Sequence, residues 1–388
     1  MSRFNALLLF VLATVASSAF SADPPPGTTL RDDEIDPATG FARSTVVRPL
    51  RDAPPVPDAR PTPKPVAARP HVALILPTAN ATLGRLAEAV RAGFMAAVEV
   101  AGKDGVPVAV TAVDNEATAL VEACRRAQEA GALLVVGGFT RDGANTLATS
   151  DCARQPVLAL NELRDELPPG VFSVSLSLEQ EARQAALLAV ADGWHAAIVI
   201  GTNTPLSRRV QEAFEREWTR AAGEFRRVAF SGNVDDAPLI RERIAGLRAD
   251  LVFFALDQVE ARAVRPYVSG MLPIYATTLS VNPRAEAIVN LDLQGVRYLE
   301  MPWFVHPDHP AVMVYPQPKA TMSVEHERLY AFGIDAFRLA LLVVRGGPGQ
   351  ASLDGVTGRI TLEERRFVRA LAPAEVDGGR VIPLRATP

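Results

Sequence analysis

Seven polar side chains follow predicted strands, and their types suit the noncovalent recognition of a small charged molecule. Hydroxyl and amide groups can hold a carboxylate, and an aspartate can pair with an ammonium group. The candidates are Thr78, Thr140, Asn161, Ser175, Thr202, Asp257 and Thr277. The same residue types also cap the helices that follow such strands, so capping without a ligand is the alternative explanation and the one we favour, since every α/β protein has such residues.

Motifs of common enzyme mechanisms are absent from the sequence. There is no Gly-x-Ser-x-Gly elbow, no metalloprotease helix, no phosphate-binding Gly-x-x-x-x-Gly-Lys, and no Gly-x-Gly-x-x-Gly after a strand. The glycine-rich run 346–349 follows a predicted helix, so we interpret it as a helix stop. We therefore predict a protein that is not an enzyme.

A short histidine cluster is the feature that comes nearest to a metal motif. His306-Pro307-Asp308-His309 lies in a Pro-rich connection without helical spacing, which favours a solvated loop over a metal site. We therefore expect neither a metal nor a cofactor. Two acidic pairs, Glu179 with Glu181 and Glu363 with Glu364, are typical of solvated faces.

The chain has two cysteines, Cys124 and Cys152. Outside the cytoplasm an even pair of this kind can form a disulfide. Both fall in consecutive predicted helices of one lobe, so a structural bridge is geometrically feasible, and two buried free thiols are the alternative.

The elements that position these residues alternate between short apolar strands and longer helices. The run Val72–Leu76 is wholly apolar, which predicts a strand covered on both faces, and Pro77 ends it. Apolar residues between Leu83 and Val98 then recur at helical spacing. Further strands are predicted at 108–113, 133–136, 157–160, 196–200, 227–230, 251–256 and 274–276, and helices at 118–130, 142–153, 182–190, 210–221, 237–247 and 259–267.

This rhythm is that of right-handed βαβ crossovers, and it restarts near Val171. We therefore predict an α/β protein with two lobes, each a doubly wound, mostly parallel sheet. Ligands of such sheets bind beyond the carboxyl ends of the strands, so the polar strand ends are expected to face a cleft between the lobes.

Composition excludes several classes of partner. The chain has 388 residues, of which 48% are hydrophobic, enough for a large buried core. Its formal net charge is −4, with Lys and Arg scattered along the chain. A basic face for nucleic acid and a polybasic membrane patch are therefore not expected.

The first 70 residues are predicted to serve export and tethering. Arg3, the apolar stretch 6–16 and the small residues around Ser21 are typical of a secretory signal peptide cleaved near Ser21. That stretch is too short to span a bilayer comfortably, although an uncleaved anchor is the alternative. Residues 22–70 are rich in proline, which predicts a disordered linker, either a passive spacer or a recognition segment. We expect the mature protein in the periplasm, without a membrane span.

Nine short blocks from Val72 to about Leu384 occur in the order typical of one family. They are VALILP, AVRAGFMAA, VLALN, SLEQEARQAA, AFEREW, IYATT, LQGVRYLEMPW, FGIDAFRLA and LDGVTGRITL. Together they resemble the carboxy-terminal domain of the penicillin-binding protein activators, the LppC-type lipoproteins. The resemblance implies a type I periplasmic-binding-protein fold, also called a Venus-flytrap or leucine-binding-protein-like fold. It also implies a regulator of peptidoglycan biosynthesis, and hence of the cell wall and cell shape, that contacts a bifunctional penicillin-binding protein.

The sequence departs from the pattern of this family in two ways. The family's acylated cysteine has no counterpart after the apolar stretch, and a Pro-rich segment stands where the family has an amino-terminal helical-repeat domain. We therefore expect anchoring to differ from that of the family, because a lipid chain contributes about 0.8 kcal/mol for each buried methylene.

The resemblance also suggests the division of the folded chain. We expect lobe one at about 71–172 and 303–350, and lobe two at about 173–302 and 351–388, with the segment from Gly358 to Pro383 completing lobe two. Trp303, beside Pro302, is a candidate contact for a partner. Packing at the lobe crossover is the alternative, and the apolar neighbours of this residue favour packing. The alternative function is that of a solute-binding protein for branched-chain or related amino acids in ABC-type uptake, with the ligand in the cleft.

Overall fold

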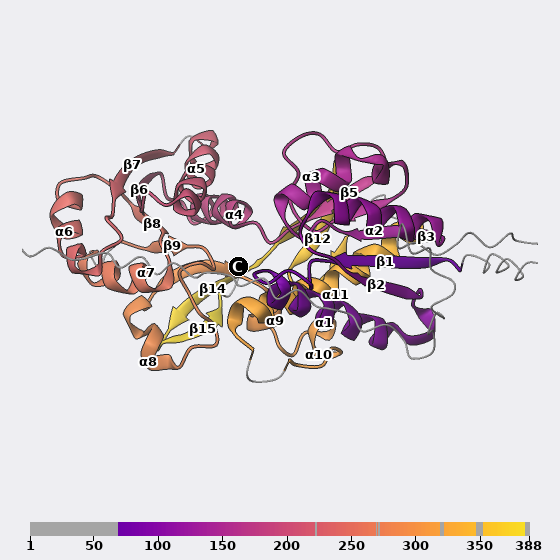
Figure 1. Ribbon diagram of the computed structural model, residues 1–388. Helices are drawn as coiled ribbons and strands as arrows, with labels where there is room; N and C mark the ends of the chain where they lie inside the picture. The colour runs from indigo at the N-terminus through magenta and orange to yellow at the C-terminus, as the bar shows by residue number, and fades with distance from the viewer. Residues whose placement is uncertain are drawn as a thin grey trace, which may run out of the picture. The chain divides into compact units, whose positions relative to one another are not determined.

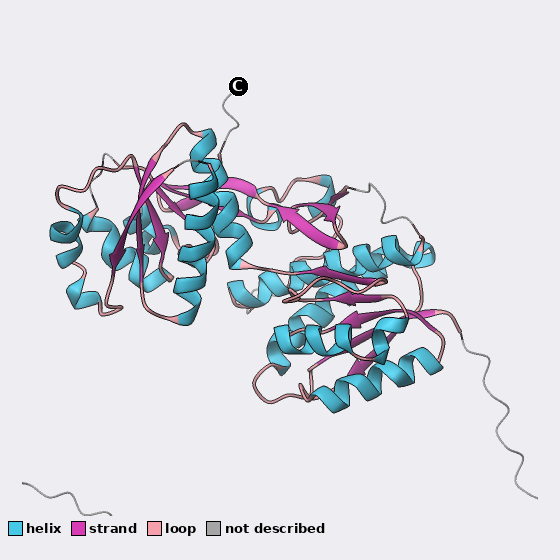
Figure 2. Ribbon diagram, turned by 90° about the horizontal axis from the view of Figure 1, so that it is seen from above, coloured by secondary structure: helices cyan, strands magenta, loops and turns pink. Residues whose placement is uncertain are grey.

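The computed structural model describes residues 69–384 apart from 222, 269, 271, 319–321 and 347–351. The predicted signal peptide, nearly all of the predicted linker and most of the glycine-rich run 346–349 lie outside the described residues. The described part contains two sheets with helices on both faces (Figure 1, Figure 2). This confirms the predicted two-lobed α/β fold.

The first sheet has eight strands in the order β11-β12-β13-β5-β4-β3-β1-β2. Its parallel part has the strand bounds β1 His71–Leu76, β2 Val108–Ala112, β3 Ala132–Gly137, β4 Val157–Ala159 and β5 Val171–Val174. Helices α1 (Gly84–Ala101), α2 (Ala117–Glu129), α3 (Arg141–Thr149) and α11 (Val324–Val344) belong to this lobe.

The unbroken apolar run of β1 is explained by two separate cores. Val72, Leu74 and Leu76 belong to the core shared with α1 and α11, whereas Ala73 and Ile75 belong to the core under α2 and α3. Because successive side chains of a strand point to opposite faces, a strand between two helical layers must be apolar at every position.

The second sheet has seven strands in the order β15-β14-β10-β9-β8-β6-β7. Its parallel strands are β6 Ala196–Gly201, β7 Glu224–Ala229, β8 Leu251–Ala255, β9 Ile274–Ala276 and β10 Val296–Glu300. The larger helices of this lobe are α4 Leu178–Ala191, α5 Pro205–Arg220, α6 Leu239–Ile244 and α7 Gln258–Val264. Short helices complete the connections: α8 Ala287–Asn290, α9 Pro302–Val305 and α10 Pro310–Met313.

The C-terminal segment differs from our expectation because it is divided between the two sheets. Strands β11 (Leu353–Asp354), β12 (Arg359–Glu363) and β13 (Arg366–Ala370) extend the first sheet, where β13 pairs with β5. Strands β14 (Ala372–Asp377) and β15 (Arg380–Pro383) extend the second, where β14 pairs with β10. The yellow end of the chain in Figure 1 therefore runs through both sheets. The chain passes from the first sheet to the second within one residue, Leu371. No run of loop-forming residues therefore marks this change in the sequence.

Helices α1 and α11 pack at very short range through two glycines. A Cβ atom at Gly93 would lie 1.8 Å from the carbonyl oxygen of Tyr330, and one at Gly333 would lie 2.1 Å from that of Val90. Both distances are far below van der Waals contact, so the helix backbones approach as closely as only glycine allows.

Two predicted helices are shorter in the structure. The helix expected at 142–153 ends at Thr149, and a separate 3-10 turn, Asp151–Arg154, follows it. The helix expected at 237–247 is limited to α6, Leu239–Ile244, and a separate 3-10 turn, Val234–Asp236, precedes it. Within the described residues, no helix has the length and apolar character that a membrane crossing requires.

Candidate functional site

Three chain crossings join the lobes and place the carboxyl ends of their strands near one another. The chain passes from β5 to α4 through 175–177, returns after β10 at Met301, and passes from β13 to β14 at Leu371. Residues from both lobes meet beside the first crossing, where they line one cavity.

This inter-lobe pocket has a volume of about 290 Å³. Its lining combines a few polar groups with apolar side chains, which is the usual character of a small-molecule site. The first lobe and the crossing contribute Phe139, Arg141, Leu160, Asn161, Ser175, Leu176, Ser177, Leu329 and Phe332. The second lobe contributes Leu178, Glu179, Leu206 and Arg209.

An ion-paired cluster dominates the polar side of the pocket. Glu179 Oε1 accepts hydrogen bonds from Arg141 Nη2 and Arg209 Nε, both at 2.8 Å. Its Oε2 accepts one from Ser177 Oγ at 3.1 Å. Arg141 lies at the start of α3 in the first lobe, whereas Glu179 and Arg209 lie on α4 and α5 in the second. The carboxylate of Glu179 therefore links the two lobes, and we call these three residues the Glu179 clasp.

The Glu179 carboxyl is strongly biased toward its charged form. Its side chain is 13% exposed, and this burial opposes ionisation. The hydrogen bonds from Arg141 and Arg209 outweigh the burial and lower the pKa of Glu179 from 4.5 to about 2. The clasp is therefore charged at all physiological pH values.

Two of the seven predicted residues line this pocket. Asn161 donates from Nδ2 to the carbonyl oxygen of Phe139 at 2.9 Å, so its amide fixes the ends of two neighbouring strands. Ser175 is 6% exposed and lies on the first crossing. These two positions fit the expectation that polar strand ends face the cleft.

The other five residues do not line the inter-lobe pocket. Thr140 caps α3 by accepting from Gly143 N at 3.0 Å. Asp257 forms a full capping box with Glu260 on α7. These contacts are the capping roles stated as the alternative.

The remaining three serve their own loops. Thr202 is buried, and its Oγ1 lies 3.2 Å from Thr204 Oγ1. Thr277 is 1% exposed and accepts from Leu279 N at 3.4 Å. Thr78 lies in the turn that follows β1, where its amide donates to the carbonyl oxygen of Leu76.

Trp303 is a packing residue and not an exposed contact. Its side chain is 1% exposed, its ring lies 5.8 Å from that of Tyr330, and its Nε1 donates to Glu327 Oε1 at 2.9 Å. The interpretation as a partner contact is therefore wrong for this arrangement, because apolar neighbours and α11 cover the indole.

Further ion pairs join the lobes on either side of the second crossing. Arg284, after β9, donates to Glu327 of α11 at 2.6 Å. Arg328 of α11 donates to Glu300 Oε2, at the end of β10, at 2.7 Å. Glu300 is fully buried, and its Oε1 accepts from Met301 N at the crossing itself. The lobes are thus held by charges at several points besides the Glu179 clasp.

The acidic pair of Glu179 and Glu181 is not on a solvated face. Glu181 is 3% exposed, and its Oε2 accepts from both Thr278 N at 3.0 Å and Thr278 Oγ1 at 2.7 Å. Burial raises the pKa of Glu181. The expectation was therefore wrong for this pair, whereas Glu363 and Glu364 are exposed as expected.

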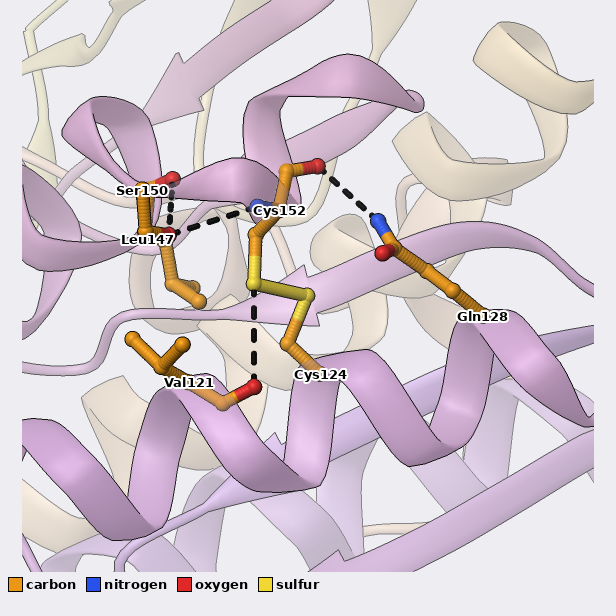
Figure 3. The surroundings of a disulfide bond; sticks show 6 residues. All are labelled: Val121, Cys124, Gln128, Leu147, Ser150 and Cys152. Carbon is orange, nitrogen blue, oxygen red and sulfur yellow. Dashed lines mark hydrogen bonds between the residues drawn. A yellow bond between two sulfur atoms is a disulfide. The ribbon is translucent and has the colours of Figure 1, made fainter.

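The two cysteines form a disulfide in the structure (Figure 3). Their Cα atoms are 6.1 Å apart, and the bond joins α2 to the turn after α3. Gln128 Nε2 also donates to the carbonyl oxygen of Cys152 at 2.9 Å. The bridge lies among α2, α3 and the first sheet, so its role is structural.

The histidine cluster forms local contacts. His309 Nδ1 accepts from Ala311 N at the start of α10, and its Nε2 lies 3.4 Å from Asp354 Oδ2. Among the residues that the structure describes, no three His, Cys, Asp or Glu side chains are arranged to share a metal ion.

The charged residues of the pocket were not identified from the sequence. Arg141 directly follows the predicted Thr140, and Glu179 lies two residues after Ser177, which caps α4. These neighbours mark the ends of elements near the pocket, but they do not indicate which charged side chains enter it. Arg209 lies 30 residues from Glu179 along the chain. Nothing in local spacing indicates that these side chains meet.

The fold and the cleft define a class of protein, that of two-lobed periplasmic-binding-protein-like domains. The family model described as "LppC putative lipoprotein" matches residues 66–249 and 242–375. The chain belongs to this family. The penicillin-binding protein activator LpoA of Haemophilus ducreyi is 27% identical over 302 residues, which cover 75% of this chain and 50% of that protein. The chain spans about half the length of the curated relatives it matches.

Solved structures show the same fold. A protein of Chromobacterium violaceum described as a "putative branched-chain amino acid ABC transporter" has a TM-score of 0.68 and 35% identity, covering 79% of this chain and 99% of that chain. The C-domain of LpoA from Haemophilus influenzae, described as a regulator of PBP1A, also has a TM-score of 0.68. It is 22% identical, and the match covers 81% of this chain and 100% of that domain.

Proposed function

We propose that this protein is a non-enzymatic periplasmic regulator that contacts a bifunctional penicillin-binding protein and stimulates peptidoglycan synthesis. The family supports this proposal, because the curated relatives are named as penicillin-binding protein activators and not as enzymes. Export by a signal peptide cleaved near Ser21, followed by a linker up to residue 70, is part of the same proposal.

The observation that carries the proposal is the Glu179 clasp. Arg141 and Arg209 are the cationic groups in the lining of the inter-lobe pocket, and a guanidinium group is a strong partner for a ligand carboxylate. Here the guanidinium groups of Arg141 and Arg209 already bind a carboxylate of the same chain. A ligand carboxylate would have to displace Glu179 in order to pair with these two arginines, and the low pKa of Glu179 reflects the strength of the existing bonds. This favours a domain that acts through its surface.

The test is a reconstitution with the bifunctional penicillin-binding proteins of the source organism. We expect saturable binding of the purified protein to one of them and an increased rate of glycan synthesis or crosslinking. Absence of both effects with every such synthase would refute the regulator function. A Glu129→Gln variant, which alters only an exposed pair with Arg125, serves as a control. It should bind and stimulate the synthase as the wild type does.

A second candidate function is the binding of a branched-chain or related amino acid. It is favoured by the 35% identity to the Chromobacterium violaceum protein and by the apolar side of the inter-lobe pocket. Leucine, isoleucine and valine at 100 times the dissociation constant would raise the free energy of unfolding by about 2.7 kcal/mol. A rise in melting temperature that Arg209→Gln abolishes would support this function over the regulator.

A further inference from the structure

A second, more polar cavity adjoins the first crossing, and no residue of α5 lines it. Its volume is about 250 Å³, and it lies among β5, the start of α4 and the start of β13. Its polar lining consists of Glu162, Ser173, Ser175, Gln180, Arg183 and Arg366. We call it the Arg183 pocket. It shares Ser175 with the inter-lobe pocket but neither Arg141 nor Arg209.

The polar lining of the Arg183 pocket includes two serine hydroxyls and one buried acceptor without a partner among the described residues. Ser173 is 4% exposed and Ser175 is 6% exposed, and the structure gives neither hydroxyl a hydrogen bond to the residues it describes. Gln180 Oε1 is buried and accepts no hydrogen bond. A buried polar atom without a partner costs roughly 1–3 kcal/mol, so Gln180 Oε1 favours an occupant that donates a hydrogen bond.

The charge of the pocket specifies one part of that occupant. Arg366 donates to the carbonyl oxygens of Asp165 at 2.7 Å and Leu163 at 3.4 Å, and it forms no ion pair with the described residues. Arg183 forms no ion pair with the described residues. Two guanidinium groups beside serine hydroxyls are the typical environment of a bound carboxylate.

The acceptors of the pocket specify the other part. Gln180 Oε1 can only accept a hydrogen bond, and the Glu162 carboxylate is held on one side by Arg141 at 3.4 Å. Gln180 Oε1 needs a donor, the Glu162 carboxylate can accept further ones, and an ammonium group supplies three. The cavity volume of about 250 Å³ suits a small molecule.

We propose that the Arg183 pocket binds a free α-amino acid with a short side chain. Arg183 and Arg366 take its carboxylate, Gln180 and Glu162 take its ammonium group, and the serine hydroxyls bond to either end. This site is distinct from the inter-lobe pocket and does not depend on the proposed contact with a penicillin-binding protein.

Titration calorimetry of the purified protein at neutral pH with glycine, L-alanine and D-alanine tests the site. We expect one molecule of at least one of these amino acids to bind per chain. Propionate lacks the ammonium group and ethylamine lacks the carboxylate, so each should bind at least tenfold more weakly, which is about 1.4 kcal/mol. Equal binding of alanine and propionate would overturn the assignment of the acceptor half of the site.

Two matched arginine variants locate the binding. Arg183→Gln is expected to weaken alanine binding at least tenfold, whereas Arg209→Gln, in the inter-lobe pocket, should leave it unchanged. Thermal melting of both variants checks that each is folded. The proposal is overturned if no amino acid binds at about 10 mM, where even a weak site of millimolar affinity would be occupied. It is equally overturned if Arg209→Gln abolishes binding and Arg183→Gln does not.

Discussion

Replacement of Glu179 by glutamine should destabilise the protein in a way that depends on pH. The lowering of the Glu179 pKa from 4.5 to about 2 measures how much better the folded state holds the carboxylate than the unfolded state does. At about 1.4 kcal/mol for each tenfold change in the acid constant, the lowering corresponds to roughly 3 kcal/mol. The side chains of Arg141 and Arg209 are 40% and 44% exposed, so solvent screens part of this energy. We expect a loss of about 2 kcal/mol at pH 7.

The sign of the pH dependence follows from the direction of the shift. A carboxyl whose pKa is lowered by folding contributes stability that is fully present above its unfolded pKa, here 4.5. This contribution disappears as the pH falls through 4.5 toward 2. The difference in free energy of unfolding between the wild type and Glu179→Gln should therefore shrink steadily over that range.

Urea denaturation of both proteins at pH 7, 5, 4 and 3 provides the measurement. Glu217→Gln is the matched control, because Glu217 pairs with Arg220 within α5 and joins no other element. We expect this control to change stability by less than about 1 kcal/mol. A loss in Glu179→Gln of the same size at pH 7 and pH 3 would refute the electrostatic explanation and indicate lost packing.

Three other changes test further features of the fold. Replacing Cys124 and Cys152 by serine should lower the free energy of unfolding by about 3 to 4 kcal/mol, the loop-entropy value for their separation of 28 residues, and denaturation with and without reductant measures it. Gly93→Ala should lower it by about 1 to 3 kcal/mol or more, because the new methyl group would overlap the backbone of Tyr330, and thermal melting would show the loss. Glu364→Gly should raise it by about 0.5 kcal/mol, since φ is 46° at this exposed turn position, and unchanged melting would contradict that relief of strain.

Most of the fold could be predicted because its signals are local. Strands such as Val72–Leu76 are buried on both faces, and the resulting apolar runs are visible in the sequence. The exchange of the C-terminal strands between sheets could not be predicted, because both β13 and β14 are short, half-buried strands and either sheet edge could accept them. Only the long-range pairing of β13 with β5 distinguishes the two possibilities.

The sites were less predictable than the fold because they depend on contacts between segments that are distant in the sequence. Thr140 and Asp257 were recognised as polar strand ends, but their capping roles and a ligand-binding role use the same residue types. The Glu179 clasp joins segments that are 30 and 38 residues apart, and its pairing depends on how two lobes meet. Burial of Trp303 likewise depends on α11, whose Glu327 lies 24 residues further along the chain.

The change of sheet at Leu371 determines how the protein can be divided. The first sheet needs residues 71–174 and also 353–370, so neither lobe is encoded by one continuous segment. A protease cut at any single crossing leaves two other covalent connections between the lobes. Limited proteolysis at one site should therefore yield fragments that stay together until denaturant is added. Expression of either half of the chain alone would leave an unpaired sheet edge, so truncation is a poor way to assign the functions of the two lobes.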